Sequence, residues 1–215
     1  MTKPKKSKHD VVCEFRCGEI LEAARKVFAR KGFENATMDE IAEAAGVAKG
    51  TVYLYFPSKR DVYLEALRCG FADLTEETMR TMEVAPTAAE KIRAYVTARV
   101  HYAEQNRDFV AIYHAEFGNM RAACLNKEFR ALYLRQTKAL GEVLRQAAEQ
   151  GQIRPVRPDA AGFIVYEITR GLVTQRLLGC SNGTAEEDIE LLFDLIWNGL
   201  APTQNGQQER QTESK

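Results

Sequence analysis

The sequence predicts an all-α protein of about nine helices, in which an N-terminal three-helix unit precedes a larger helical domain. Apolar residues recur at spacings of three and four along most of the chain, which is the period of an α-helix. Alternating patterns typical of strands are nearly absent. Four hydroxyl–acid pairs stand three residues apart, a spacing typical of helix N-termini: Thr37 and Glu40, Ser58 and Asp61, Thr87 and Glu90, and Thr184 and Glu187.

The first three helices are expected at about 14–31, 38–45 and 49–55. An apolar stripe from Ile20 to Phe28 defines the first, and Gly32 follows its end. Gly46 ends the second, because the sharp turn there requires a residue that tolerates a positive φ. The third lasts less than two turns before Pro57, which cannot continue a helix.

The later helices are expected at about 58–81, 87–105, 107–118, 125–150, 158–179 and 185–200. The clearest stripe runs from Phe129 to Ala147 and ends before Gly151. Pro202 follows the last helix. We expect residues 1–13 to form a flexible basic arm, and residues 203–215 are polar enough to predict a disordered tail.

The composition is that of an ordinary globular protein, with 45% hydrophobic and 28% charged residues among 215. No apolar run is long enough to span a bilayer, and no signal-peptide core follows the basic N-terminus, so we expect a cytoplasmic protein. The five cysteines are scattered and odd in number, which favours reduced thiols. Cys13 and Cys17 stand four apart, as a two-ligand metal clip would require. No second Cys/His pair accompanies them, so we expect neither a metal site nor a cofactor.

Charge is unevenly distributed although the net charge is zero. Residues 1–60 carry 12 Lys and Arg against 8 Asp and Glu, a balance of +4, and the remainder carries 18 against 22, a balance of −4. A basic front end on an acidic body favours contact between the front end and a polyanion.

Residues 37–56 combine a short helix, a tight turn at Gly46 and a second short helix, which together predict a helix-turn-helix. Val52 and Phe56 are four apart and are expected to point into the core. The other side chains of the second helix are then left on its outer and flanking faces. A helix this short is suited to place its N-terminal end in a DNA major groove.

The outward residues have the chemistry that DNA requires. The Lys49 and Lys59 ammonium groups can neutralise phosphates, and Gly50 allows the sugar-phosphate chain to come close. Thr51 can exchange a hydrogen bond with a base edge and touch a thymine methyl. We also expect phosphate contacts from three hydroxyl groups, those of Thr37, Tyr53 and Tyr55.

The segment GFENATMDEIAEAAGVAKGTVYLYFPSKRDVYLEAL, residues 32–67, resembles the DNA-binding domain of TetR-family transcriptional regulators. The likeness covers about residues 14–74. It implies that the chain is no enzyme and that its DNA contacts are Thr37, Lys49, Gly50, Thr51, Tyr53, Tyr55 and Lys59. Residue 48 is Ala, where the family often has Ser or Thr, so we expect a backbone N–H to serve the phosphate there.

The resemblance also implies that residues 75–202 form a helical domain that dimerises and binds a small ligand. We expect the helices at 158–179 and 185–200 to pair with a second copy, because both carry apolar residues on more than one face. The alternative is that these residues are simply the core of the domain. A dimer would select a palindromic operator, and the resemblance implies a repressor that the ligand releases from it.

Candidate ligand contacts are the aromatic and polar residues of the middle helices, although core packing is an alternative for each of them: His101, Tyr102, Tyr113, His114, Phe117, Tyr166, Glu167 and Arg170. Glu167 and Arg170 interrupt an apolar helix three residues apart. They form either a structural ion pair or part of a pocket in which Arg170 attracts an anion.

Two other functions are compatible with the sequence. The chain could be a TetR-like DNA-binding protein that responds to a protein partner instead of a small ligand. A helical enzyme is a remote alternative, because none of the common catalytic or phosphate-binding motifs occurs in the sequence.

Overall fold

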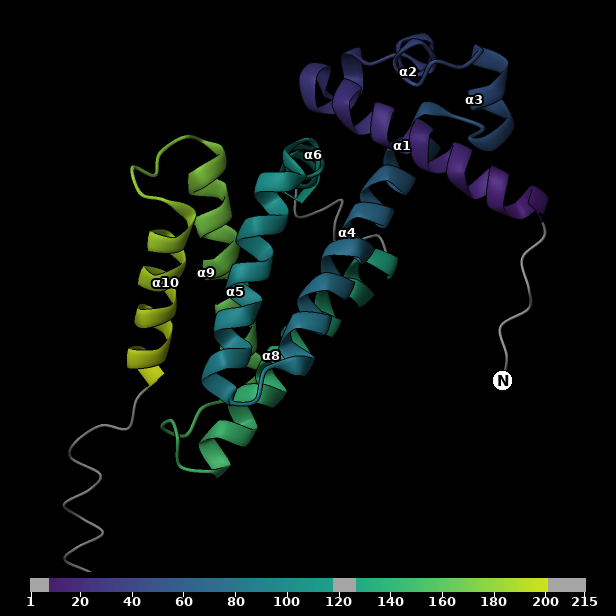
Figure 1. Cartoon of the computed structure of the whole chain (residues 1–215). Coiled ribbons are helices and arrows are strands. Elements are labelled where there is room, and N and C mark those ends of the chain that lie inside the picture. The colour runs from purple at the N-terminus through teal and green to yellow at the C-terminus, as the bar shows by residue number, and fades with distance from the viewer. Residues whose placement is uncertain (1–7, 118–126, 201–215) are drawn as a thin grey trace, which may run out of the picture. The chain divides into compact units, whose positions relative to one another are not determined.

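The computed structural model describes residues 8–117 and 127–200, and Figure 1 shows that these residues form helices joined by short connections. The all-α prediction is therefore confirmed for the described residues. Their nine helices are α1 (Lys8–Asn35), α2 (Met38–Ala44), α3 (Lys49–Tyr55), α4 (Lys59–Val84), α5 (Ala88–Gln105), α6 (Arg107–Phe117), α8 (Lys127–Glu149), α9 (Pro158–Leu177) and α10 (Ala185–Leu200).

The hydroxyl–acid pairs lie at helix N-termini as the sequence predicts. Thr37 of α2 forms a complete capping box with Glu40, and the pairs before α5 and α10 do the same. Ser58 differs in one half of the motif. Its hydroxyl accepts the Asp61 N–H, but it donates to the Asp61 carboxylate, so the acid binds the hydroxyl instead of the backbone N–H.

Helix α1 is longer than predicted. It begins at Lys8 instead of about residue 14, so residues 8–13 of the expected arm are helical. At the other end, Gly32 has φ 75° and ψ 166°, which breaks the helix where the sequence places its end. A further helical turn to Asn35 follows the break. Residues 1–7 and the expected tail from 203 to 215 lie outside the described residues.

The chain divides into two compact units. The first contains α1, α2, α3, α4 up to Phe71, and α6; the second contains α4 from Ala72 onward, with α5, α8, α9 and α10. Fully buried side chains from several helices form the core of the first unit: Ile20, Ile41, Val52, Leu67 and Phe71. The core of the second unit includes Ile92, Val96, Leu140 and Leu144.

Helix α6 groups with the N-terminal helices, although it follows the predicted boundary near residue 74 in the sequence. Sequence order would assign α6 to the second unit, but its side chains pack within the first. The Tyr63 hydroxyl donates to the Ile112 carbonyl at 3.5 Å, and the Tyr113 ring lies 5.4 Å from the Phe71 ring. The Arg25 guanidinium lies over the Phe109 ring at 5.9 Å. These contacts bury one face of α6 against α1 and the first part of α4.

Within the described ranges 8–117 and 127–200, no helix combines the length and the apolar character needed to cross a membrane.

Candidate DNA-binding site

The turn between α2 and α3 has the geometry that the sequence predicts. Gly46 has φ 64°, and its N–H donates to the Glu43 carbonyl while the Val47 N–H donates to the Ala42 carbonyl. These two bonds form a Schellman motif, which requires a residue in the left-handed region after the helix. The turn therefore fixes the direction in which α3 leaves α2.

Burial divides α3 into an inner and an outer face. Val52 is fully buried and Phe56 almost so, as predicted from their spacing. Lys49 and Gly50 are exposed, Tyr53 is 45% exposed, and Thr51 is half-buried. Thr37 is exposed at the start of α2. A short helix held by two inward residues thus presents hydrogen-bonding groups on its other side.

Lys49 is paired with an acid of α2. Its ammonium lies 2.8 Å from the Asp39 carboxylate, and this hydrogen bond raises the pKa of Lys49. The lysine therefore stays charged over the whole physiological range. A DNA phosphate would have to compete with Asp39 for the same ammonium.

We expect Asp39→Asn to increase DNA affinity about fivefold at low salt, because an exposed charge pair of this kind is worth at most ~1 kcal/mol. The substitution removes a carboxylate that repels phosphate and competes for Lys49. Glu83→Gln is the control. It removes the same charge near the C-terminal end of α4, in the second unit, and should leave DNA affinity unchanged. Titration of a labelled duplex at two salt concentrations measures both variants, and an equal gain from both would remove the assignment of Asp39 to the interface.

Gly50 has no reason inside the protein to be glycine. A Cβ built on it meets no atom within 4 Å, and its φ lies outside the left-handed region. Glycine within a helix costs stability relative to alanine. The open space beside Gly50 is suited to the close approach of a partner backbone.

We expect Gly50→Ala to move stability and DNA affinity in opposite directions. Alanine should raise the free energy of unfolding by up to about 1 kcal/mol, whereas the added methyl group should lower DNA affinity about tenfold through overpacking. Urea denaturation and duplex titration measure the two effects. Gly18→Ala is the matched control, since Gly18 of α1 also has open space around it. An unchanged affinity for Gly50→Ala would show that DNA does not approach this residue.

Two predicted contacts are directed into the protein. The Tyr55 hydroxyl donates to the Cys13 Sγ at 3.9 Å instead of projecting outward. The Lys59 ammonium donates to the Glu34 and Ala36 carbonyls, both at 3.0 Å, and lies 4.6 Å from the centre of the Phe33 ring. Lys59 therefore connects the start of α4 to the last turn of α1 and to Ala36, which follows it. The spacing of the residues did not reveal these tertiary contacts.

Two further features belong to this surface. Leu54 is 79% exposed on α3, so its side chain is available for apolar contact with a thymine methyl. Ala48 precedes α3 with φ −67° and ψ 145° and provides no side-chain cap. The sequence placed Leu54 on the outer or flanking faces without giving it a role, because an exposed leucine alone is not a functional signal.

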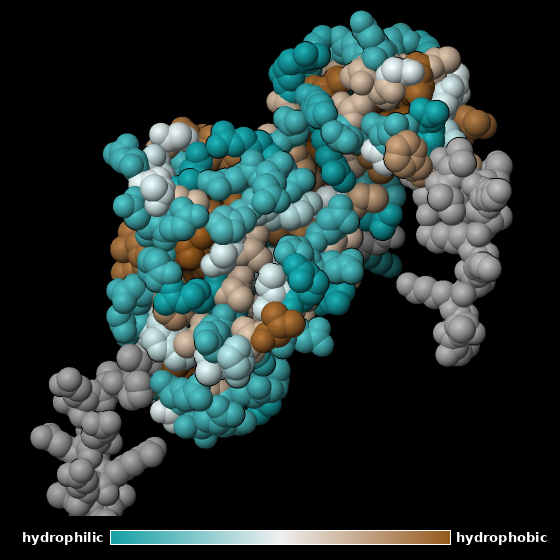
Figure 2. Space-filling model, in the orientation of Figure 1, coloured by the Kyte–Doolittle hydropathy of each residue, from teal (hydrophilic) through white to brown (hydrophobic). Residues whose placement is uncertain are grey.

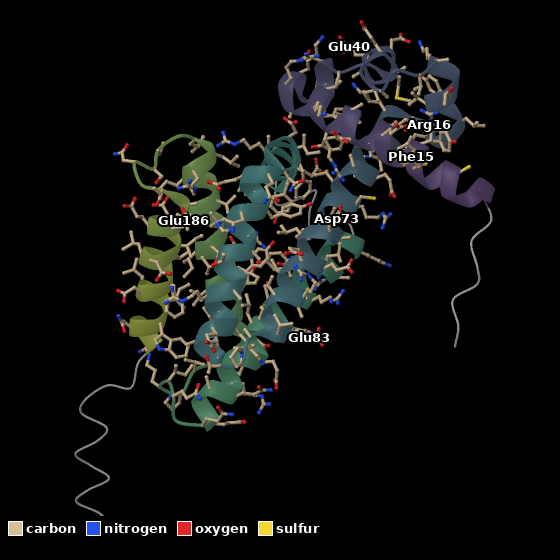
Figure 3. All side chains as sticks on the ribbon, in the orientation of Figure 1. Phe15, Arg16, Glu40, Asp73, Glu83 and Glu186 are labelled. Atoms are coloured by element: carbon tan, nitrogen blue, oxygen red, sulfur yellow. The ribbon has the colours of Figure 1, made fainter. Side chains whose placement is uncertain are left out.

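The predicted ligand contacts are divided between the two units. Tyr113 is buried in the first unit between the Phe71 and Phe109 rings, and the His114 ring meets Tyr113 edge-on. The side chain of Phe117 lies outside the described part of the structure. In the second unit, Tyr102 of α5 is half-buried, and His101 faces the Glu186 carboxylate of α10 at 3.6 Å. Figure 3 labels Glu186 on α10.

Tyr166, Glu167 and Arg170 form a cluster on α9 with Tyr133 of α8. The Arg170 guanidinium donates to the Glu167 carboxylate at 2.5 and 2.9 Å. The two side chains thus form an ion pair, which is one of the two arrangements that the sequence predicts. Glu167 also accepts the Tyr133 hydroxyl at 3.0 Å, and the Tyr133 and Tyr166 rings lie 4.6 Å apart. Burial, followed by the Glu167 charge, raises the pKa of Tyr133, so its hydroxyl remains a donor.

A buried polar cluster beside Tyr166 was not predicted. Arg99 of α5 is 4% exposed, and its guanidinium donates to the Tyr95 hydroxyl at 3.2 Å and the Gln136 Oε1 at 3.0 Å. The guanidinium lies 4.4 Å from the centre of the Tyr166 ring. The Gln136 amide donates to the Thr75 hydroxyl of α4 at 2.9 Å. The only sequence signal was a glutamine within the apolar stripe of α8.

The helices expected to dimerise expose several apolar side chains. Ile164 and Ile168 of α9 are exposed, and so are Leu191 and Leu195 of α10, at 60% and 63%. In Figure 2, hydrophobic atoms gather on the side where Figure 1 draws α10. Within each pair the residues are four apart, so each pair lies on one helix face.

In the described residues, no group of three or more His, Cys, Asp or Glu side chains is arranged to hold a metal ion.

Two protein-family models match the chain. Residues 20–66 match the model described as "Bacterial regulatory proteins, tetR family", and residues 85–174 match "Tetracyclin repressor-like, C-terminal domain".

Individual relatives extend over most of the chain. The transcriptional repressor KstR2 of Rhodococcus jostii is 30% identical over 194 residues, covering 87% of this chain and 92% of its own. The structure of the regulator FadR from Bacillus subtilis in complex with stearoyl-CoA superposes with a TM-score of 0.74 at 21% identity, over 85% of this chain and 98% of that one. A regulator from Saccharomonospora viridis in complex with choline also gives 0.74, at 25% identity, over 89% and 100%.

Proposed function

We propose, from the premise that this chain belongs to the tetR family of bacterial regulatory proteins, that it is a homodimeric repressor which a small-molecule effector releases from a palindromic operator. Membership makes the chain a helix-turn-helix DNA-binding transcriptional regulator and not an enzyme. The dimer, the palindrome, the repression and the effector are the proposal.

The observation that carries the proposal is the outer face of α3. Lys49, Gly50, Thr51 and Tyr53 lie on or beside that face, while Val52 is fully buried behind them. We assign Thr51 to a base edge and assign phosphate contacts to Lys49, Tyr53 and Thr37. We assign Tyr55 and Lys59 to holding α3 and the start of α4 in place, because their polar groups contact α1 and the chain after it.

Exposed apolar residues support dimerisation through α9 and α10. The α9 face with Ile164 and Ile168 and the α10 face with Leu191 and Leu195 each gain free energy by leaving water, at roughly 25 cal/mol for each Å² buried. A two-fold dimer repeats the α3 surface and would place the two half-sites about 34–36 Å apart or at another groove-matched spacing. Residues 14–74 and 75–202 would then be the DNA-binding and regulatory segments, apart from the placement of α6.

Small-molecule control is supported by the relatives, whose structures contain stearoyl-CoA and choline. Because these ligands differ in chemistry, they support the existence of an effector and not its identity. The cluster of Tyr166, Glu167 and Arg170 with Arg99 and Tyr133 provides donors, acceptors and aromatic rings within the regulatory helices.

The chain passes between the two units inside α4, after Phe71, and again at the α5–α6 junction. A change in the regulatory helices can therefore reach the DNA-binding unit through continuous backbone. An effector needs only ~1–3 kcal/mol of differential affinity for the two forms to change operator occupancy.

Selection from random duplex DNA tests the proposal. The full chain is incubated with the library at two salt concentrations, and the bound duplexes are sequenced. We expect a palindrome whose binding loses affinity as salt rises. Enrichment of an asymmetric single site would contradict the dimer, and strongly salt-dependent binding without enrichment would contradict sequence-specific repression.

A further inference from the structure

Two cysteines of α1 lie beside the helix that carries the proposed DNA contacts. Cys13 and Cys17 are four residues apart, both are half-buried, and neither is part of a disulfide. Four-residue spacing places the two side chains on the same face of a helix. Two cysteines are too few for a four-ligand zinc site, which is why the sequence predicts none here, and the function proposed above gives the pair no role.

The pair touches α3 through Tyr55. The Tyr55 hydroxyl donates to the Cys13 Sγ at 3.9 Å. This hydrogen bond is the first cause of the raised pKa of Tyr55. Arg16 acts in the opposite direction on the same hydroxyl, and Figure 3 labels Arg16 on α1. The Cys13 sulfur atom therefore contacts a side chain of α3, and Cys17 lies on the same face of α1 as Cys13.

Helix geometry decides which two-thiol chemistry suits the pair. Side chains four apart on a helix have Cβ atoms about 5–6 Å from each other. A disulfide requires about 3.5–4.5 Å, so it would force the helix to unwind. Two thiolates bound on opposite sides of one metal ion stand about 4.6 Å apart, twice a typical metal–sulfur distance of about 2.3 Å. An intact helix therefore accommodates a bridging metal ion better than a disulfide.

We propose that Cys13 and Cys17 form a two-thiolate site for a soft, thiophilic metal ion, and that loading of this site lowers DNA affinity through Tyr55. Thiolates prefer soft ions, and a monovalent copper ion accepts two sulfur ligands in a linear arrangement. Binding forms two S–metal bonds and releases both thiol protons to the solvent, without oxidation or reduction. This input is additional to the proposed effector.

The consequence for α3 follows from the contact with Tyr55. When Cys13 turns its sulfur toward a metal ion shared with Cys17, the hydrogen bond from Tyr55 is lost. The link between α1 and α3 through these two side chains then loosens. Because Tyr53 and Tyr55 are on the same short helix, the orientation of the DNA-contacting face changes with it.

The binding test uses copper(I) alone, supplied as its acetonitrile complex in oxygen-free buffer. The starting protein is the full chain with Cys69, Cys124 and Cys180 replaced by serine, so that Cys13 and Cys17 are its two thiols. Native mass spectrometry should show one copper ion per chain. Replacement of either Cys13 or Cys17 by serine should weaken binding about 100-fold, because the second sulfur binds intramolecularly. Equal binding by the single variants, or no binding by the starting protein, would overturn the site.

The DNA test compares loaded and metal-free protein on the selected duplex, or on a random duplex if selection recovers no site. Loading should lower affinity at least about fivefold, and a competing dithiol should restore it. Tyr55→Phe should retain copper binding but lose the response to it. Unchanged DNA affinity on loading would overturn the proposed coupling between the metal site and DNA binding, whatever the copper-binding test shows. Circular dichroism of each serine variant shows that it is folded, and Cys→Ala versions replace any that is not.

Discussion

Replacing both Leu191 and Leu195 by glutamate should convert the protein to a monomer and lower operator affinity at least 100-fold. Burial of each leucine in a subunit interface contributes about 1.5–3 kcal/mol, and a carboxylate in the same place must be desolvated as well. Both residues are more than half exposed in the single chain, so the substitutions leave its core intact. A monomer holds one half-site at a time and loses the gain from simultaneous binding of the second.

Analytical ultracentrifugation and titration of the selected duplex measure the two effects on the same samples. Val84→Glu is the control, because Val84 is also an apolar residue that is more than half exposed, at the end of α4. It should remain dimeric with unchanged affinity. A double variant of α10 that stays dimeric would show that the copies pair through another surface. A monomer with full affinity would separate dimerisation from DNA binding.

Local signals made the helix-turn-helix predictable from the sequence. The Thr37 capping box and the Gly46 turn depend on residues within a few positions of each other, so their hydrogen bonds can be anticipated from spacing. The helix period likewise identified Val52 as buried. These elements follow from backbone geometry, which a short segment already determines.

Contacts between distant segments were not predictable in the same way. Nothing near Lys59 in the sequence indicates that its ammonium binds the carbonyls of Glu34 and Ala36. The same holds for α6, whose Phe109 and Tyr113 fit any apolar core but in fact pack with the first unit. Periodicity shows which face of a helix is buried and not what covers it.

Gln136 shows how a polar residue in an apolar stripe becomes informative only with its partners. On α8 it falls in the same stripe as Leu140 and Leu144, and by itself it could be a boundary residue. In the structure it is almost fully buried, accepts from the Arg99 guanidinium and donates to the Thr75 hydroxyl. It therefore connects α5 to the second half of α4 through side chains.

We expect Gln136→Leu to lower the free energy of unfolding by about 3 kcal/mol. The substitution removes a hydrogen bond to a charged group, worth about 1.5–3 kcal/mol, and a neutral one worth about 1 kcal/mol. Urea denaturation at fixed protein concentration measures the change. Gln146→Leu is the control, because Gln146 lies on the same helix but is exposed and donates to the Glu142 carboxylate. Equal losses from the two variants would show that the buried bonds contribute nothing beyond helix propensity.

Combining Gln136→Leu with Arg99→Met separates the cost of a buried charge from the loss of packing. In Gln136→Leu the Arg99 guanidinium loses an acceptor. Adding Arg99→Met should then raise the free energy of unfolding by about 1–2 kcal/mol, because a buried charge with fewer partners costs more than an apolar side chain of similar volume. Additive losses would instead mean that Arg99 and Gln136 stabilise the fold independently.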